Sequence, residues 1–168
     1  MSWGEDEEEN WYDTSQICLE GHMVNSCAES QPESNKKFCS QCGAATILSC
    51  PHCSTKIKGY HHVSGVLSLR EDEPEKFCDN CGQPYPWSES RLKAALDLAG
   101  ELDGLTEQER DDLKKSLPDL LRDVPNTPVA ATRFKKLARK AAGKGGELVW
   151  DILKDIASET ATKIILGR

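Results

Sequence analysis

Aromatic side chains make up only 6 % of the 168 residues, and apolar residues of all kinds only 38 %. Because so few large side chains can build only a small core, we expect another source of stability. The chain also lacks an uninterrupted apolar run of the roughly 18 residues that a membrane-spanning helix needs. It begins without an export signal, so we expect a cytoplasmic protein whose cysteines stay reduced.

Cysteine and histidine are missing from the second half of the sequence, although the first half is rich in both. All eight cysteines and all four histidines lie between residues 15 and 87. The first fourteen residues carry six acids and no base. This division predicts an acidic flexible leader at 1–14, a double zinc ribbon at 15–87 and a helical tail at 88–168. The predicted fold class is small β-rich zinc ribbons followed by helices.

Four close pairs of residues have the spacing of metal ligands. They are Cys18 with His22, Cys39 with Cys42, Cys50 with Cys53, and Cys78 with Cys81. A C-x-x-C turn places two thiolates on one side of the backbone, where both reach a tetrahedral ion at about 2.3 Å. Two pairs complete a closed site, so the sequence predicts two structural Zn²⁺ ions with no open position for catalysis.

An internal repeat indicates which pairs combine. The sequence K-F-C-x-x-C-G occurs at residues 37–43 and again at 76–82. Either a sequential or a cross-braced arrangement of the four pairs would satisfy the spacing. We predict the sequential one, because the repeat then falls second in each ribbon. The first site therefore joins the Cys18 pair to the Cys39 pair, and the second joins the Cys50 pair to the Cys78 pair.

Further cysteine and histidine side chains compete with these ligands. Cys27 is an alternative to His22 in the first site, but His22 follows Gly21 and can turn back towards Cys18. The remaining histidines are His52, His61 and His62. No acid or thiol accompanies the last two at ligand spacing, so we interpret them as surface or packing residues rather than a third metal site.

The order of these motifs resembles an uncharacterised bacterial double zinc-ribbon family of unknown function. The resemblance covers roughly residues 15–90 and includes Ile17-Cys18 to Gly21-His22, the two repeats, Cys50-Pro51-x-Cys53 and Pro84-Tyr85-Pro86-Trp87. It implies that His22 rather than Cys27 is the ligand. Residues 118–135 are similar to helical tails on bacterial proteins, some of them linked to phage defence.

The tail contains several local helix signals. Thr106 and Glu109 form a T-x-x-E capping box, and Pro118 is expected to disturb the helix that follows. The last predicted helix covers residues 147–166 and has a broad apolar stripe. A lone helix of this kind needs a partner, so we expect it to mediate self-association or docking on another protein.

These patterns favour a protein-interaction module over an enzyme. No phosphate-binding loop, nucleophile elbow or H-E-x-x-H motif is present in the sequence. The first alternative is nucleic-acid binding through residues 133–144, which carry six bases and no acid. The second is a basic amphipathic helix lying on a membrane surface. A part in bacterial antiviral defence is expected from the resemblance of the tail alone.

Overall fold

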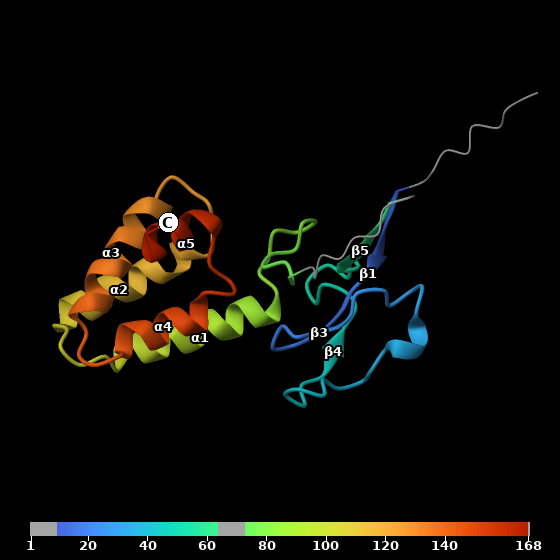
Figure 1. Ribbon diagram of the computed structural model, residues 1–168, viewed down its shortest axis with the longest axis horizontal. Helices are drawn as coiled ribbons and strands as arrows, with labels where there is room; N and C mark the ends of the chain where they lie inside the picture. Colours follow the sequence, from blue (N-terminus) through green and yellow to red (C-terminus); the bar gives the residue numbers. More distant parts are fainter. Residues whose placement is uncertain (1–9, 64–72, 168) are drawn as a thin grey trace, which may run out of the picture. The chain divides into compact units, whose positions relative to one another are not determined.

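The chain forms two compact units that meet between Trp87 and Ser88. The computed structural model describes residues 10–63 and 73–167. Within these residues, every strand lies in the first unit, and the second unit is made of helices (Figure 1). The structure therefore confirms the predicted order of small cysteine-bearing sheets followed by a helical region.

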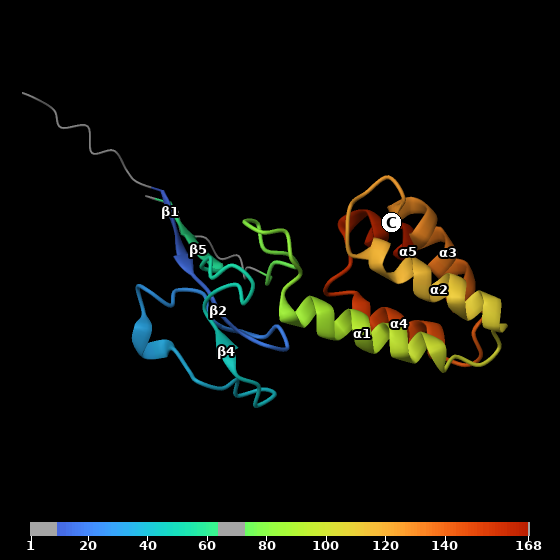
Figure 2. The same cartoon turned by 180° about the vertical axis from the view of Figure 1, so that it is seen from behind.

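Short strands form two small antiparallel sheets in the first unit. One sheet pairs β1 (Trp11–Thr14) with β5 (Lys58–His62). The other has the order β3 (Met23–Asn25), β2 (Gln16–Cys18) and β4 (Thr46–Ile47). Figure 1 labels β3 and β4, and Figure 2 labels β2 and β4 from behind. A 3₁₀ turn, η1 (Pro32–Ser34), follows β3 in the chain.

The pairing of β1 with β5 contains a bulge. Trp11 lies opposite His62, but the register has shifted by one residue where the pairing reaches Thr14. β5 contributes the extra residue, which bends it locally. Gly59 lies in this bulge, and a Cβ atom there would come within 2.3 Å of the Ser26 carbonyl oxygen. Glycine is therefore required for the loop after β3 to approach β5 this closely.

The predicted acidic leader extends too far. Its last four residues form β1, and both Asp13 and Thr14 are buried. The error arose because acidic composition was given more weight than the aromatic pair and the threonine at 11–14, which favour a strand. Residues 1–9 of the predicted leader and residues 64–72 of the predicted double ribbon lie outside the described residues.

The core of the first unit combines apolar side chains with cysteines. It consists of Ile17, Cys50, Ile57, Cys78, Tyr85 and Trp87. The Tyr85 and Trp87 rings stack with centroids 4.6 Å apart, and Trp87 Nε1–H donates to the Glu75 carbonyl at 2.9 Å. Burial raises the pKa of Tyr85 far above its usual range. Because this core includes predicted ligands, metal binding and apolar packing support the same structure.

Five helices make up the described part of the second unit. They are α1 (Pro86–Gly100), α2 (Glu107–Leu120), α3 (Thr127–Lys140), α4 (Gly145–Leu153) and α5 (Glu159–Leu166). Helix α3 contacts α2, α4 and α5, so it lies at the centre of the unit. Arg91 of α1 forms an ion pair with Asp155, which follows α4 in the chain.

The predicted capping box is present at the start of α2, but Pro118 does not end the helix. The Thr106 hydroxyl accepts from the Glu109 N–H, and the Glu109 carboxylate accepts from the Thr106 N–H, so the capping box is formed. Pro118 lies inside α2 instead of ending it. The fully buried Leu117 and Leu120 hold this last turn in the core, which outweighs the hydrogen bond that proline removes.

The predicted single helix at 147–166 is wrong, because two helices cover this stretch. The break lies at 154–158, between α4 and α5. The Ser158 hydroxyl accepts from the Ala161 N–H and caps α5. Its own N–H donates to the Leu120 carbonyl at 2.7 Å, which fixes the break against the end of α2.

Much of the apolar stripe of this segment is buried inside the second unit itself, while Ile152, Ile164 and Ile165 are half-buried. Val149, Leu153, Ile156 and Ala161 are each at most 2 % exposed. They join a core that contains Leu113, Leu117 and Phe134. The segment therefore has internal partners, and the reason for assigning it to self-association or docking no longer holds. Within residues 10–63 and 73–167, every helix is too short or too polar to cross a bilayer.

Candidate metal centres

The first predicted ligand set meets at one point in the first unit. Cys18 ends β2, and His22 follows after a tight turn in which Gly21 has a φ of 87°. Cys18 Sγ lies 3.4 Å from His22 Nδ1 and 3.7 Å from Cys42 Sγ. Cys39 Sγ lies 3.7 Å from the same histidine nitrogen. All four donor atoms are within 4.8 Å of one another, and we call this set the first quartet.

The second quartet consists of Cys50, Cys53, Cys78 and Cys81, whose sulfur atoms also lie within 4.8 Å of one another. Cys50 Sγ is 3.8 Å from Cys81 Sγ, and Cys53 Sγ is 3.6 Å from Cys78 Sγ. Both distances join one C-x-x-C turn to the other. The quartets use consecutive parts of the chain without interleaving, which is the sequential arrangement.

These separations are those of tetrahedral metal sites. Two sulfurs that are each about 2.3 Å from a tetrahedral ion lie about 3.8 Å apart, and a sulfur and a nitrogen lie roughly 3.6 Å apart. The measured contacts run from 3.4 to 3.8 Å. A disulfide would place its sulfurs only about 2.05 Å apart, and all eight cysteines carry free thiols. Each quartet could therefore hold one metal ion.

The three C-x-x-C turns have the same backbone structure. In each turn, the N–H of the first cysteine donates to the carbonyl of the residue five positions later. The carbonyl of the same cysteine accepts from the N–H of the residue four positions later. All these distances are 2.8 to 2.9 Å. This fourth residue has positive φ: 74° at Gly43, 70° at Gly82 and 62° at Ser54. The turn at Cys50 therefore has the same conformation as the other two, although Ser54 stands where they have glycine.

Hydrogen-bond donors beside Cys39 and Cys53 favour the thiolate form that binds metal. At Cys42 and Cys81, by contrast, a backbone hydrogen bond to each is outweighed by burial and the neighbouring cysteines, which raise the pKa of both thiols. The Gln41 N–H points at Cys39 Sγ from 3.4 Å and is the main cause that lowers the pKa of Cys39 to about 7. The Cys53 thiol lies 3.4 Å from the Thr55 hydroxyl, and this side-chain hydrogen bond is the main cause that lowers the pKa of Cys53 to about 6. Donors aimed at sulfur stabilise negative charge before any ion arrives.

The geometry favours His22 over Cys27 as the fourth ligand of the first quartet. His22 contributes its Nδ1 atom to the first quartet, whereas Cys27 lies in a different group of side chains. The His22 N–H also donates to Cys18 Sγ at 3.2 Å, so this residue supports the site with its backbone as well. His52, between the two cysteines of its turn, is exposed.

We expect His22→Ala to lower the metal content by about one ion per chain, because three ligands remain where a closed structural site needs four. His52→Ala is the matched control, since it removes an exposed imidazole beside the second quartet. Elemental analysis of both purified variants measures the effect. Full metal content in His22→Ala would contradict the assignment of His22.

The interpretation of His61 and His62 requires a correction for His62. His61 stacks on Tyr12 with ring centroids 4.1 Å apart, which is a packing role as predicted. For His62, the sequence showed no acidic or thiol partner. The structure provides both, because Asp13 and Cys27 offer donor atoms within 4.8 Å of its ring nitrogen. The signal was missed because both partners are far away along the chain.

Comparison with other proteins identifies the family of this chain. No curated protein and no solved structure matches it significantly. Residues 11–165 match a family described as "Uncharacterized protein conserved in bacteria (DUF2321)". The match includes β1, both quartets and nearly all of the helical unit, which confirms the resemblance to an uncharacterised bacterial family. The chain therefore belongs to the bacterial family DUF2321.

Proposed function

We propose that this protein is a cytoplasmic, non-enzymatic interaction module in which two structural Zn²⁺ ions hold a ribbon unit that docks on another protein. The closure of the quartets is the observation that carries this proposal. Each quartet already offers four ligands, so an ion at its centre would have no free coordination position for a substrate. Thiolate and imidazole ligands in tetrahedral geometry favour zinc. A place in phage defence rests on the resemblance of the tail alone.

An exposed apolar surface on the first ribbon supports the docking part of the proposal. Phe38 and Ala45 form an isolated bridge, and the Leu19 N–H donates to the Ala45 carbonyl at 3.0 Å. Residues paired across strands point to the same side of a sheet. Phe38 is 64 % exposed and Leu19 is 37 % exposed. Large apolar side chains in adjacent positions outside a core are typical of protein contacts.

We expect Phe38→Ser to reduce capture of a protein partner about tenfold or more. Burying a phenylalanine contributes roughly 1.5–3 kcal/mol, and each 1.4 kcal/mol is a factor of ten in affinity. The measurement is affinity capture with the full chain from lysate of the native bacterium, quantified by mass spectrometry. Leu48→Ser is the matched control, because Leu48 is 41 % exposed and strand alternation directs it away from Ala45.

The outcome separates docking from folding. Unchanged metal content in Phe38→Ser shows that the quartets are intact, so a loss of capture then belongs to the surface. Equal capture by the wild type and both variants would contradict docking through Phe38. Equal loss in both variants would also contradict it, because the effect would not be confined to one face.

The nucleic-acid alternative receives less support from the structure. Of the six bases at 133–144, Lys140 pairs with Glu109 at 2.6 Å. The Lys135 ammonium donates to the Ile164 carbonyl at 2.9 Å. These two cations are used inside the helical unit, which leaves a smaller basic surface for phosphates. The membrane-surface alternative loses its apolar face, since that face lies in the core.

A further inference from the structure

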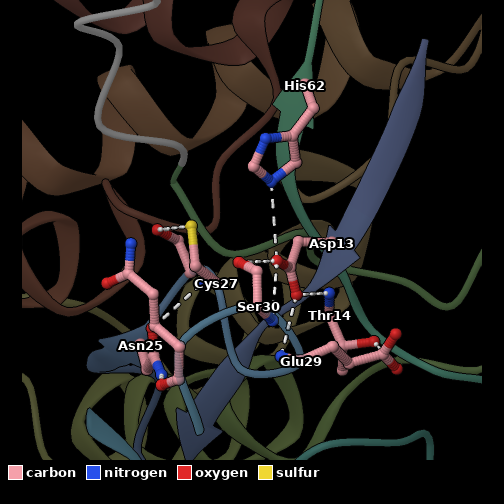
Figure 3. Close-up of polar contacts among 9 residues, drawn as sticks. Asp13, Thr14, Asn25, Cys27, Glu29, Ser30 and His62 are labelled. Atoms are coloured by element: carbon pink, nitrogen blue, oxygen red, sulfur yellow. Dashed lines mark hydrogen bonds and ion pairs between the residues drawn. The ribbon is translucent and has the colours of Figure 1, made fainter. Parts of the chain in front are cut away.

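We propose a third metal site in which Asp13, Cys27 and His62 bind a divalent transition-metal ion of the zinc class and leave one coordination position open. The three donor atoms lie within 4.8 Å of one another. Figure 3 shows the Nε2 end of the His62 ring directed at Asp13, with the Cys27 sulfur beside the same gap. The site shares no ligand with either quartet.

The closest pair of donors already has the separation of metal ligands. His62 Nε2 lies 3.5 Å from Asp13 Oδ2. Nitrogen and oxygen ligands about 2.0–2.1 Å from a tetrahedral zinc ion are roughly 3.3–3.4 Å apart. The Cys27 sulfur lies within 4.8 Å of both of these atoms. A small movement of its side chain towards them would let all three donor atoms bind one ion.

Asp13 is held in position by hydrogen bonds to both of its carboxylate oxygens. Its Oδ1 accepts from the Thr14 and Glu29 N–H groups at 2.6 and 2.9 Å. Its Oδ2 accepts from the Ser30 hydroxyl and N–H and is the oxygen that faces His62. Burial opposes ionisation, but these bonds outweigh it and hold the pKa of Asp13 below its usual value. Metal-bound carboxylates are characteristically supported by such outer hydrogen bonds.

The backbone places Cys27 between the two strands that carry its partners. The Ala28 N–H donates to the Thr14 carbonyl of β1, and the Tyr60 N–H of β5 donates to the Ser26 carbonyl, both at 2.8 Å. Gly59 permits the second contact by leaving room for Ser26. The Cys27 N–H donates to Asn25 Oδ1 at 2.9 Å, which fixes the turn. The thiol is therefore positioned by the fold and lies in no quartet.

His62 presents a nitrogen that is buried but has no hydrogen bond. The ring stacks on Trp11 with centroids 4.0 Å apart and meets the edge of Tyr60 at 4.9 Å, so its orientation is restricted. Its Nε2 is inaccessible to solvent and has no hydrogen-bond partner among the described residues. The nearest charged atom to it is Asp13 Oδ2 at 3.5 Å. A buried polar atom without a hydrogen bond costs about 1–3 kcal/mol, and an ion bound between these two atoms would satisfy the nitrogen.

The arrangement fits an ion better than a cysteine–histidine–aspartate catalytic relay. In such a relay one ring nitrogen contacts the carboxylate while the other contacts the thiol. Here Asp13 and the Cys27 sulfur both lie below the His62 ring in Figure 3, on the side of Nε2. A single ring nitrogen cannot hydrogen-bond the carboxylate and the thiol at once in the way that a relay requires. It can, however, bind the same metal ion as both of them.

The mixed ligand set also indicates the class of ion and its geometry. Imidazole and thiolate select zinc or a similar transition metal over magnesium and calcium, which prefer oxygen ligands. Three protein ligands with a free fourth position are characteristic of sites that bind water or a small exogenous ligand. The quartets, by contrast, are saturated by the protein.

Cobalt titration of the zinc-loaded full chain tests the proposal, because Co²⁺ is a coloured substitute for zinc. We expect one equivalent of Co²⁺ to bind while both quartets keep zinc, with a thiolate-to-cobalt charge-transfer band. Cys27→Ser should abolish that band, and His62→Gln should abolish saturable binding. His61→Gln is the matched control and should bind Co²⁺ as the wild type does.

Zinc content provides the folding check for each variant. Two zinc ions per chain in Cys27→Ser and His62→Gln show that the quartets are formed, so the loss of cobalt belongs to the third site. The proposal is overturned if the wild type shows no saturable charge-transfer band. It is also overturned if Cys27→Ser and His62→Gln both retain the cobalt binding of the wild type.

Discussion

Removing the quartet metals is expected to unfold the described residues up to Trp87 and to leave the helices folded. Zinc binding to structural sites supplies an apparent 10–16 kcal/mol or so per ion, whereas a whole domain is stable by only about 5–15 kcal/mol. The core of the ribbon unit also contains Cys50 and Cys78, so metal loss disturbs its packing directly. The helical unit contains neither cysteine nor histidine and has its own core.

Hydrogen exchange measured by mass spectrometry resolves this difference along the chain. After treatment with a strong chelator, peptides from residues 10–63 and 73–87 should lose protection, while peptides from 88–167 keep it. Zinc added in excess of the chelator should restore the protection and serves as the control. If the ribbon peptides kept their protection, metal binding would not stabilise the ribbon unit. If both units lost protection together, the helical unit would not be stable without the metals.

The second large effect is expected in the helical unit, where Ile156→Glu should unfold the helices. Ile156 is 2 % exposed, and a carboxylate at this position would be buried without a partner. A cost of about 4 kcal/mol or more corresponds to a fall in Tm of roughly 16 °C or more for a unit of this size. Thermal unfolding followed by circular dichroism measures the change.

Leu148→Glu provides the matched control on the same segment, because Leu148 is 52 % exposed and should tolerate the charge. Zinc content should stay at its wild-type value in both variants, since the quartets lie in the other unit. If Ile156→Glu instead stayed folded and changed only the assembly state, the residue would belong to an intermolecular contact. That result would restore the docking role first assigned to residues 147–166.

The quartets could be predicted from sequence because their information is local. Each pair of ligands lies within five residues of chain, and a tight turn is enough to bring the pair together. Even the sequential grouping followed from the repeat. The turn at Cys50 was predicted as a ligand pair, but its likeness to the other two turns was not, because a serine at position 54 takes the positive φ that the pattern attributes to glycine.

The cluster of Asp13, Cys27 and His62 could not be predicted in the same way. Its members meet only because β1 pairs with β5 and a loop is pinned between them, and no spacing rule describes that arrangement. The break at Ser158 was missed for a related reason. Apolar periodicity continues through residues 147–166, whereas the break depends on a hydrogen bond to Leu120 in another helix.

The non-interleaved order of the quartets has a consequence for how the chain is made. The last ligand of the first quartet is Cys42, and that of the second is Cys81. At about 5–20 residues per second, the ribosome adds the intervening residues in roughly 2–8 seconds. During that interval the first quartet is complete, while the second still lacks all four of its ligands at the start and only Cys81 at the end. A nascent chain can therefore capture its first ion before its remaining thiols exist, which prevents the two cysteine sets from competing for the same metal.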